Sequence, residues 1–576
     1  MSRETVRIRV PALARVEGEG ALELDIEAGR IRDLKLRIYE PPRLFEKLLE
    51  GREFHEVPDL VARICGICPV AYQMSGARAL ESLLAVAVPP EAAAMRRVMY
   101  CGEWIQSHAL HIHLLAAPDF FGCDSVVALA GREPEAVRRG LALQALGNRL
   151  ITLFGGRSVH PVGVKVGGFH RLPGAAEVTA VLGELDTGLA QAEALVHWCA
   201  AIELPDRPQD FLSVATDEPE VYPIMGERIR ASDGLDIGIS EFEAYFEEQQ
   251  LPHSTALHCR LQGRPYLVGP LARLNLFHER LPEPVRGLMR AAGVAFPSNN
   301  MFHSMLARAL EVFYAVWEAR RLLRDYREGA PAAVEAAAGA GTGFGCTEAP
   351  RGLLWHRYGL HPDGTVARAR IVPPTSQNQA RMEEDLHRAL EAFGLERPPA
   401  EIRRHAETVI RNYDPCISCA THFLRLTLRG DRDHAPPPRV AGGPVAVMGI
   451  GSPAPGDDAG WRVAEALAGR EDVRVLCLDR PGLGLVDHIE AFPRAVLVDA
   501  APGLRRPRWL APGELEGGGG PLSSHAGGVA EALALARALG LAVEGIRVLA
   551  VPADGDSGVD LAVAELTRWL DRRAPA

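Results

Sequence analysis

The sequence predicts two domains of different class. The first is a mainly helical α+β domain with a small N-terminal β part, and the second is a three-layer α/β domain with a mostly parallel sheet. Alternating strands at the start give way to long amphipathic stretches after about residue 42. Residues 429–443 carry charges, successive prolines and glycines, as linkers do. The predicted boundaries are therefore 1–428, 429–443 and 444–576.

The first domain begins with period-two alternation, which predicts strands at 6–10, 21–26 and 31–39. Apolar residues then recur at helical spacing over four long stretches, 90–118, 134–152, 175–203 and 300–328. Small residues dominate 330–345, which predicts a loop. A strand at 371–374 and a helix at 378–393 complete the predicted domain.

In the second domain, four short apolar runs read as buried strands: VAVMGIG, VRVLCLD, RAVLVDA and IRVLAV. Helical stretches lie between or after them, at about 457–468, 527–539 and 557–572. Alternation of fully apolar strands with helices is typical of a parallel sheet covered on both faces.

Composition excludes several classes of function. A chain of 576 residues exceeds one ordinary domain. The net charge of −11 argues against binding to nucleic acid. We find neither a membrane-length apolar run nor a secretory signal, so we expect a cytoplasmic protein without a membrane span. The ten cysteines do not form a disulfide framework, but four of them make two C-x-x-C pairs.

These pairs are Cys65 with Cys68 in RICGIC and Cys416 with Cys419 in DPCISCATH. Each pair can bring two sulfurs to one ion, so together they could build a four-thiolate site. Structural zinc is the simplest interpretation of the spacing. Zinc modules usually keep both pairs close in sequence, however, whereas most of the predicted first domain separates these two.

The residues around the cysteines favour another interpretation. Eight blocks, in order, resemble the large subunit of nickel–iron hydrogenases: RVEGEG (15–20), RLFEKLLEGR (43–52), RICGICPVAY (63–72), HALHIHLLAAPDF (108–120), GGRSVHP (155–161), EAPRGLLWH (348–356), VPPTSQN (372–378) and DPCISCATH (414–422). The resemblance covers nearly all of residues 5–425. Either C-x-x-C pair alone would be weak evidence, whereas the ordered set is specific.

The resemblance implies a nickel–iron centre that carries cyanide and carbon monoxide on iron. Cys65 and Cys416 would be terminal nickel ligands, and Cys68 and Cys419 would bridge nickel and iron. Soft thiolates suit these metals. The reaction would be H2 ⇌ 2 H+ + 2 e−, with Cys416 receiving the proton when H2 is split.

The resemblance also assigns roles to residues around the centre. Glu17 would relay the proton outward, and Arg351 would face the polar ligands of iron. Further residues would orient Arg351 and nearby groups (Asp119 and Asp414) or line the cyanide pocket (Pro374 and Thr375). Without this context, Glu17 would read as a strand-end carboxylate, Arg351 as half of a surface ion pair, and Asp414 as a turn residue.

A separate magnesium ion is implied at Glu46 and His422, with a main-chain carbonyl near Arg370 as a further ligand. His113 and His160 lie in matching blocks too, where the alternative is a hydrogen-bonded core residue.

Tyr72 stands where many large subunits have a histidine, a form that looks most like the cytoplasmic, NAD(P)-linked branch that includes the sulfhydrogenases. This branch implies an iron–sulfur small subunit, flavin and iron–sulfur subunits that reduce NAD(P), and maturation proteins for nickel and for the iron centre. The other six cysteines lack cluster spacing, so we expect no iron–sulfur cluster in this chain. The related complex I subunit lacks the nickel cysteines, which argues against a complex I-like role.

Two interpretations compete for the second domain. G-x-G after the first strand, with Asp479 ending the second, suggests dinucleotide binding. Pro453 and Pro455 fit such a loop poorly, and Asp457 with Asp458 would repel a pyrophosphate.

The alternative is a resemblance to the nickel-dependent endopeptidases that mature hydrogenase large subunits, carried by GIGSPAPGDD, VLVDA and SSHAGG. It implies nickel sensing by Asp458, Asp499 and His525, and cleavage between His422 and Phe423. Ser452 and Asp458 depart from the usual asparagine and glutamate, and Asp458 could instead cap a helix.

Overall fold

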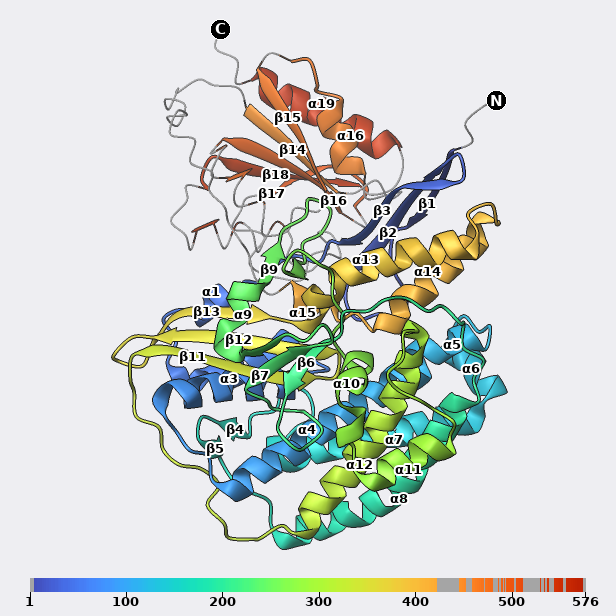
Figure 1. Ribbon diagram of the computed structural model, residues 1–576. Helices are drawn as coiled ribbons and strands as arrows, with labels where there is room; N and C mark the ends of the chain where they lie inside the picture. The colour runs from blue at the N-terminus through green and yellow to red at the C-terminus, as the bar shows by residue number, and fades with distance from the viewer. Residues whose placement is uncertain are drawn as a thin grey trace. The chain divides into compact units, whose positions relative to one another are not determined.

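The computed structural model describes residues 5–421 and, in the second unit, 445–451, 458–470, 472–479, 494–501, 504–510, 543–552 and 556–572, with a few single residues between them. The chain divides into two compact units, Met1–Arg425 and Leu426–Ala576 (Figure 1). Among the described residues, no helix is both long and apolar enough to cross a bilayer.

The first unit opens with an antiparallel sheet in the order β1-β2-β3, formed by Thr5–Val10, Gly20–Glu27 and Arg30–Ile38. The predicted alternation is confirmed. Leu22, Leu24 and Ile26 point into the core while their neighbours in sequence are more exposed.

Four long helices form the helical body and confirm the predicted helical stretches: α4 (Pro90–Leu110), α7 (Pro134–Gly155), α8 (Ala175–Ala200) and α12 (Ser304–Arg324). Helices α4 and α7 pack closely because Gly102 and Gly147 face each other. A Cβ atom at Gly147 would collide with the backbone of α4. Helix α4 runs directly into a π-helical turn, η3 (His111–Ala116), and then into α5 (Ala117–Phe120).

A second antiparallel sheet joins β11 (Gly341–Ala349), β12 (Gly352–Leu360) and β13 (Val366–Val372). The loop predicted for 330–345 is therefore wrong from Gly341 onward. Its glycines serve close packing, because Gly343 and Gly345 lie against the backbone of α3 (Pro69–Leu84), where a Cβ would collide. Helix α13 (Pro374–Phe393) begins four residues before the predicted start, and α14 (Pro399–Tyr413) and α15 (Ile417–Ala420) follow it.

Shorter elements complete the first unit. The helices are α1 (Phe45–Leu49), α2 (Val57–Val61), α6 (Val126–Arg132), α9 (Phe242–Tyr245), α10 (Pro270–Phe277) and α11 (Glu283–Ala291). The 3-10 turns are η1 (Phe54–Glu56), η2 (Ala62–Ile64), η4 (Ile239–Glu241), η5 (His278–Arg280) and η6 (Met301–His303). The strands are β4 (Val164–Lys165), β5 (Gly168–Phe169), β6 (Val214–Asp217), β7 (Arg228–Ala231), β8 (Asp236–Gly238), β9 (Phe246–Gln249) and β10 (His258–Leu261).

The second unit contains a five-stranded sheet in the order β15-β14-β16-β18-β17. Strands β14 (Val445–Gly451), β15 (Val473–Asp479), β16 (Ala495–Ala501) and β18 (Ile546–Pro552) are parallel, and β17 (Arg508–Leu510) is antiparallel. Helices α16 (Ala459–Glu465) and α19 (Asp556–Asp571) pack in an apolar cluster with one set of alternate side chains of the sheet. The other set of alternate side chains belongs to a second apolar cluster. The predicted linker, 429–443, lies outside the described residues.

Candidate metal centre

The four cysteines of the two C-x-x-C pairs meet at one buried point. The Sγ atoms of Cys65 and Cys416 are 3.4 Å apart, as are those of Cys68 and Cys419, and Cys416 and Cys419 are 2.9 Å apart. All four sulfurs lie within 4.8 Å of one another. The fold thus joins residues near the two ends of the first unit in one four-thiol cluster.

Local structure fixes each pair. Cys65 follows η2, and Cys68 immediately precedes α3. The Glu103 carboxylate on α4 accepts hydrogen bonds from the amides of Val70 (2.6 Å) and Ala71 (3.1 Å), so it caps the N-terminus of α3. Gln106, one turn further along α4, donates to the carbonyl of Ile67. Helix α4 therefore holds the first pair from behind.

The second pair is held by the N-terminal segment of the chain. The backbone of Glu17 bridges that of Cys416, and the Ile417 amide donates to the Glu17 carbonyl at 3.0 Å. The Cys416 amide donates to Thr375 Oγ1 at 3.0 Å, at the start of α13. Pro374 is the buried first residue of that helix.

The electrostatics of the cluster favour a cation. Burial raises the pKa of the Cys68, Cys416 and Cys419 thiols. Burial opposes ionisation of Cys65 too, but hydrogen bonds from the other thiols and the charge of Arg351 hold the pKa of Cys65 well below its usual range. The amides of Ile67 and Cys68 also donate to Cys65 Sγ, at 3.3 and 3.2 Å. Four thiolates at this spacing need cations between them, and the donor set suits soft transition metals such as nickel and iron.

Arg351 lies beside the thiols with its guanidinium fixed. Its Nε donates to the Asp414 carbonyl at 2.8 Å, and a terminal nitrogen donates to Asp414 Oδ1 at 3.0 Å. Burial works against its charge, but Asp414 and the cysteines raise the pKa of Arg351 well above its ordinary value. Asp414 adopts a left-handed conformation (φ 57°), which aspartate tolerates better than most residues, and this turns the chain from α14 toward Cys416.

Asp119, predicted to orient Arg351 and nearby groups, contacts two other arginines. Its carboxylate pairs with Arg411 at 2.7 and 2.9 Å and with Arg15. Arg411 lies in the last turn of α14, just before the second cysteine pair. Asp119 therefore ties the loop before β2 to the helix that carries the DPC turn.

Glu17 lies next to the cluster. Its Oε2 accepts a hydrogen bond from the Ser418 amide at 3.1 Å. Burial and the neighbouring Cys65 thiolate raise the pKa of Glu17, and this outweighs the lowering by Ser418, Cys416 and Arg351. A carboxyl with a raised pKa beside a thiol is suited to accept a proton and pass it on.

The remaining predicted residues of the first unit are Glu46 and His422, expected at a magnesium ion, and the histidines His113 and His160. Glu46 Oε1 accepts from the Ile371 amide at 2.7 Å, which brings it to the segment next to Arg370, but His422 lies outside the described residues. His113 Nδ1 hydrogen bonds the Ala109 carbonyl (2.9 Å), and its ring stacks on Trp198. His160 Nδ1 hydrogen bonds the Ala62 carbonyl (2.8 Å).

In the second unit, Asp499 is buried in β16, and Asp458 directly precedes α16 without a side-chain capping hydrogen bond. His525 and the proposed cleavage position lie outside the described residues. Asp479 ends β15.

Sequence reasoning missed the residues that hold the site from outside the motifs. Three of them are polar residues at helical spacing on the buried side of α4: Glu103, Gln106 and Ser107. The Ser107 hydroxyl lies 3.4 Å from the guanidinium of Arg351. That spacing, in a helix whose neighbouring positions are buried, was the available signal.

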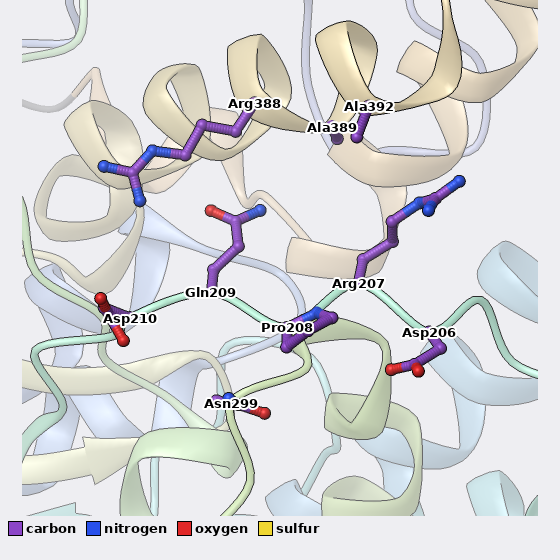
Figure 2. Close-up of a pocket in the computed structure, with 9 residues that line it drawn as sticks. All are labelled: Asp206, Arg207, Pro208, Gln209, Asp210, Asn299, Arg388, Ala389 and Ala392. Atoms are coloured by element: carbon purple, nitrogen blue, oxygen red, sulfur yellow. The ribbon is translucent and has the colours of Figure 1, made fainter.

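A surface hollow of about 470 Å3 lies elsewhere, between residues 206–210 and the C-terminal half of α13 (Figure 2). Arg207 and Arg388 line it together with Asp206 and Asp210. Their charges balance, and none of the predicted site residues borders it. The buried thiol cluster is therefore the better candidate for the chemistry.

Comparison with known proteins agrees with this geometry. The family model for nickel-dependent hydrogenases matches residues 43–139 and 242–422. The chain is 34% identical over 426 residues to the sulfhydrogenase 2 alpha subunit of Pyrococcus furiosus, covering 73% of this chain and 100% of that one. It is 29% identical over 475 residues to the beta subunit of the NAD-reducing hydrogenase HoxS of Cupriavidus necator, covering 74% and 96%.

Among solved structures, an NAD+-reducing [NiFe]-hydrogenase in its H2-reduced state has a TM-score of 0.66 and 27% identity, over 72% of this chain and 99% of that one. A [NiFeSe] hydrogenase variant from Desulfovibrio vulgaris Hildenborough, at 22% identity and a TM-score of 0.59, shares the fold over 73% of this chain.

Proposed function

Because this chain belongs to the nickel-dependent hydrogenase family, as a catalytic large subunit, we propose that Cys65, Cys68, Cys416 and Cys419 hold its nickel–iron centre. The observation that carries the proposal is the convergence of four buried thiols, contributed from both ends of the unit, beside a permanently charged arginine. When bound, a nickel–iron centre with cyanide and carbon monoxide on iron polarises H2 and takes up its two electrons.

Residues of this chain accept the protons and transfer them away from the metal centre. Splitting H2 yields two protons and two electrons, and the Cys416 thiolate is the proposed first acceptor of a proton. Glu17 interacts directly with Cys416, and its raised pKa lets it take that proton and release it. Arg351 keeps a fixed positive charge facing the cluster, and Asp414 holds its orientation through two hydrogen bonds.

Pro374 and Thr375 support the same site from α13. Thr375 already fixes the backbone of Cys416, and the proposal gives both residues a place in the pocket for the diatomic ligands of iron. We also propose a magnesium site that secures the end of the mature subunit. Its ligands are Glu46, His422 and a main-chain carbonyl near Arg370.

Electrons leave through partner subunits on this proposal. The sulfhydrogenase and NAD-reducing relatives support an iron–sulfur small subunit and flavin and iron–sulfur subunits that reduce NAD(P). Nickel and iron-centre maturation proteins would load the site. A cytoplasmic location fits these relatives.

We further propose that the second unit is a maturation endopeptidase that cuts between His422 and Phe423. Two of its proposed nickel ligands lie at neighbouring parallel strands: Asp499 is near the carboxyl end of β16, and Asp458 follows β14. Ligands of open α/β sheets bind at carboxyl strand ends, which supports this unit as a metal-responsive site. Asp479 at the end of β15 keeps dinucleotide binding as the alternative.

Intact mass of the full chain tests the endopeptidase proposal. The chain is co-expressed with its accessory proteins, with and without nickel, and compared with Asp458→Ala and His525→Ala. We expect a mature product ending at His422 only with nickel and only in the unsubstituted chain. A full-length chain that is active in nickel-replete cells would overturn the proposal. If Asp458→Ala and His525→Ala are still cleaved and the chain binds NAD(P), the dinucleotide alternative is favoured.

A further inference from the structure

Outside the thiol cluster, two histidines and a glutamate converge in the first unit. His253 Nε2 lies 2.8 Å from Glu383 Oε1, and His258 Nε2 lies 3.1 Å from Glu383 Oε2. The three ligand atoms lie within 4.8 Å of one another, and the two imidazole rings meet edge to face at 5.6 Å. The two Nε2 atoms therefore share one carboxylate.

Three separate parts of the chain build this cluster. His253 follows β9, His258 is the first residue of β10, and Glu383 lies in the middle of α13. The His258 side chain is fully buried, whereas those of His253 and Glu383 are 16% and 18% exposed. Two of the three side chains therefore keep a part of their surface in contact with solvent.

The donor set is ready for a cation. The Leu36 amide in β3 donates to Glu383 Oε1 at 3.0 Å, which fixes the carboxylate. The carboxylate oxygens and the imidazole nitrogens are donors of the kind that divalent ions take, and each imidazole offers its Nε2 lone pair when its proton is on Nδ1.

The donor set suits an ion of zinc type. Zinc binds imidazole nitrogen and carboxylate oxygen at about 2.0–2.2 Å, so tetrahedral geometry places neighbouring ligand atoms roughly 3.3–3.6 Å apart. The observed N–O separations of 2.8 and 3.1 Å are those of hydrogen bonds, and the side chains would move apart by roughly half an ångström to admit the ion. Two histidines with one glutamate also leave the fourth position for water.

We propose that His253, His258 and Glu383 bind a divalent cation of the zinc class, at a site separate from the four cysteines. On binding, each imidazole carries its ring proton on Nδ1, and its Nε2 lone pair binds the ion in place of the present hydrogen bond to Glu383. It links β10 and the loop after β9 to α13, which begins at Pro374 and Thr375 beside Cys416. The ion thus braces the helix that supports the thiol cluster.

Cobalt(II) titration of the full chain tests the proposal, because Co2+ gives different spectra with nitrogen–oxygen ligands and with thiolates. The titration uses nickel-starved, unloaded chain that carries Asp458→Ala and His525→Ala, which remove the other proposed site with nitrogen and oxygen ligands. We expect one set of d–d bands that lacks thiolate-to-metal charge transfer, in addition to any bands from the cysteines. His253→Gln and Glu383→Gln should each weaken this component by more than ~10-fold, since even loss of an outer-shell partner costs that much.

His387→Gln is the matched control, because His387 pairs with Glu391 on the same helix at an exposed position. It should leave Co2+ binding unchanged. Zn2+ should also raise the thermal midpoint of the unsubstituted chain and of His387→Gln by more than that of either site variant, because all of these chains keep the four cysteines and only the first two keep the second site. Spectra with thiolate bands only, or nitrogen–oxygen bands that survive both site substitutions, would overturn the proposal and leave a hydrogen-bonded His–Glu network.

Discussion

Burial acts in opposite directions on the two charged residues that face the thiols. It raises the pKa of Glu17 and makes this carboxyl easier to protonate, whereas the guanidinium of Arg351 stays charged because Asp414 and the thiols compensate for its desolvation. Glu17 can therefore move protons, and Arg351 can only hold charge and position. This difference explains why both types of residue border one site.

Glu17→Gln separates proton transfer from metal binding. The amide keeps the acceptor oxygen for the Ser418 amide but cannot carry a proton. We expect normal nickel and iron content and a loss of H2 oxidation of about 10^2–10^4-fold, the range that general acid–base groups contribute. Glu17→Asp should keep more activity than Glu17→Gln. Equal activity of Glu17→Gln and the parent would contradict the relay.

Buried histidines make the first unit sensitive to acid. Burial lowers the pKa of His108 and His113 to about 4, and of His111 to about 3, against an ordinary 6.5. The unfolded chain binds more protons than the folded chain between pH 6.5 and these values. The stability that each neutral ring contributes is therefore full above pH 6.5 and is lost as the pH falls toward 4.

His113→Phe tests this at one ring, because phenylalanine can keep the stack on Trp198 but cannot titrate. We expect a lower stability at pH 7 from loss of the hydrogen bond to Ala109, but a smaller further loss between pH 7 and pH 5. The difference should approach 1–2 kcal/mol, since one pKa unit is about 1.4 kcal/mol. Thermal or urea unfolding at both pH values measures it, and parallel pH profiles would refute the assignment.

At the scale of elements, the turn between β11 and β12 is held by a buried ion network. Arg273 in α10 donates to the carbonyls of Ala349 (3.0 Å) and Pro350 (3.1 Å), next to Arg351. Its guanidinium pairs with Glu311 (2.7 Å) and Glu348 (2.9 Å), and all three side chains are fully buried. The network sets the position of the turn that presents Arg351 to the thiols.

Arg273→Met should destabilise the first unit by about 3–5 kcal/mol, because it leaves two buried carboxylates without their partner. The thermal midpoint measures this effect. Arg403→Met is the control: Arg403 forms an exposed pair with Glu407 in α14, and its loss should change stability by less than ~1 kcal/mol. Equal losses of stability from the two substitutions would show that the buried network stabilises the first unit no more than an exposed ion pair does.

The elements also show what the sequence could predict. Strands β1 to β3 and helices α4, α7, α8 and α12 carry enough periods of alternation or amphipathicity to be recognised. Strands β6 to β10 have three or four residues each, too few for a pattern, and the glycines of β11 resemble a loop until their contact with α3 is seen.

The candidate site divides in the same way. The four cysteines, Glu17, Arg351 and Asp414 stand in short motifs, and the structure brings them together. Glu103 and Arg273 stand in no motif, because their contribution arises only when α4 and α10 pack against distant segments. The pair of Asp119 with Arg411 has the same origin, since it joins α5 to the distant helix α14.

At the scale of the whole molecule, metal at the four cysteines would tie together two segments separated by 351 positions in the chain. By the chain-entropy argument used for disulfides, closing a loop of this length restricts the unfolded state by on the order of 5 kcal/mol.

Metal loading should therefore protect the end of the first unit. We expect limited proteolysis to cleave the unloaded chain near α14 and α15 faster than the nickel-loaded chain, by about 10-fold or more, as opening becomes less favourable. Mass spectrometry of the fragments locates the cuts. Identical cleavage rates with and without nickel would mean that the metal does not join the two ends.

Metal analysis of the purified mature chain shows whether the four cysteines hold nickel and iron. Both metals are measured together with zinc and H2 oxidation, in the parent and in Cys65→Ser and Cys416→Ser. We expect one nickel and one iron per active chain, both lost with activity in each cysteine variant, while zinc at His253, His258 and Glu383 is unaffected. Zinc that is lost on substitution of either cysteine, in a parent chain without nickel or iron, would contradict this expectation.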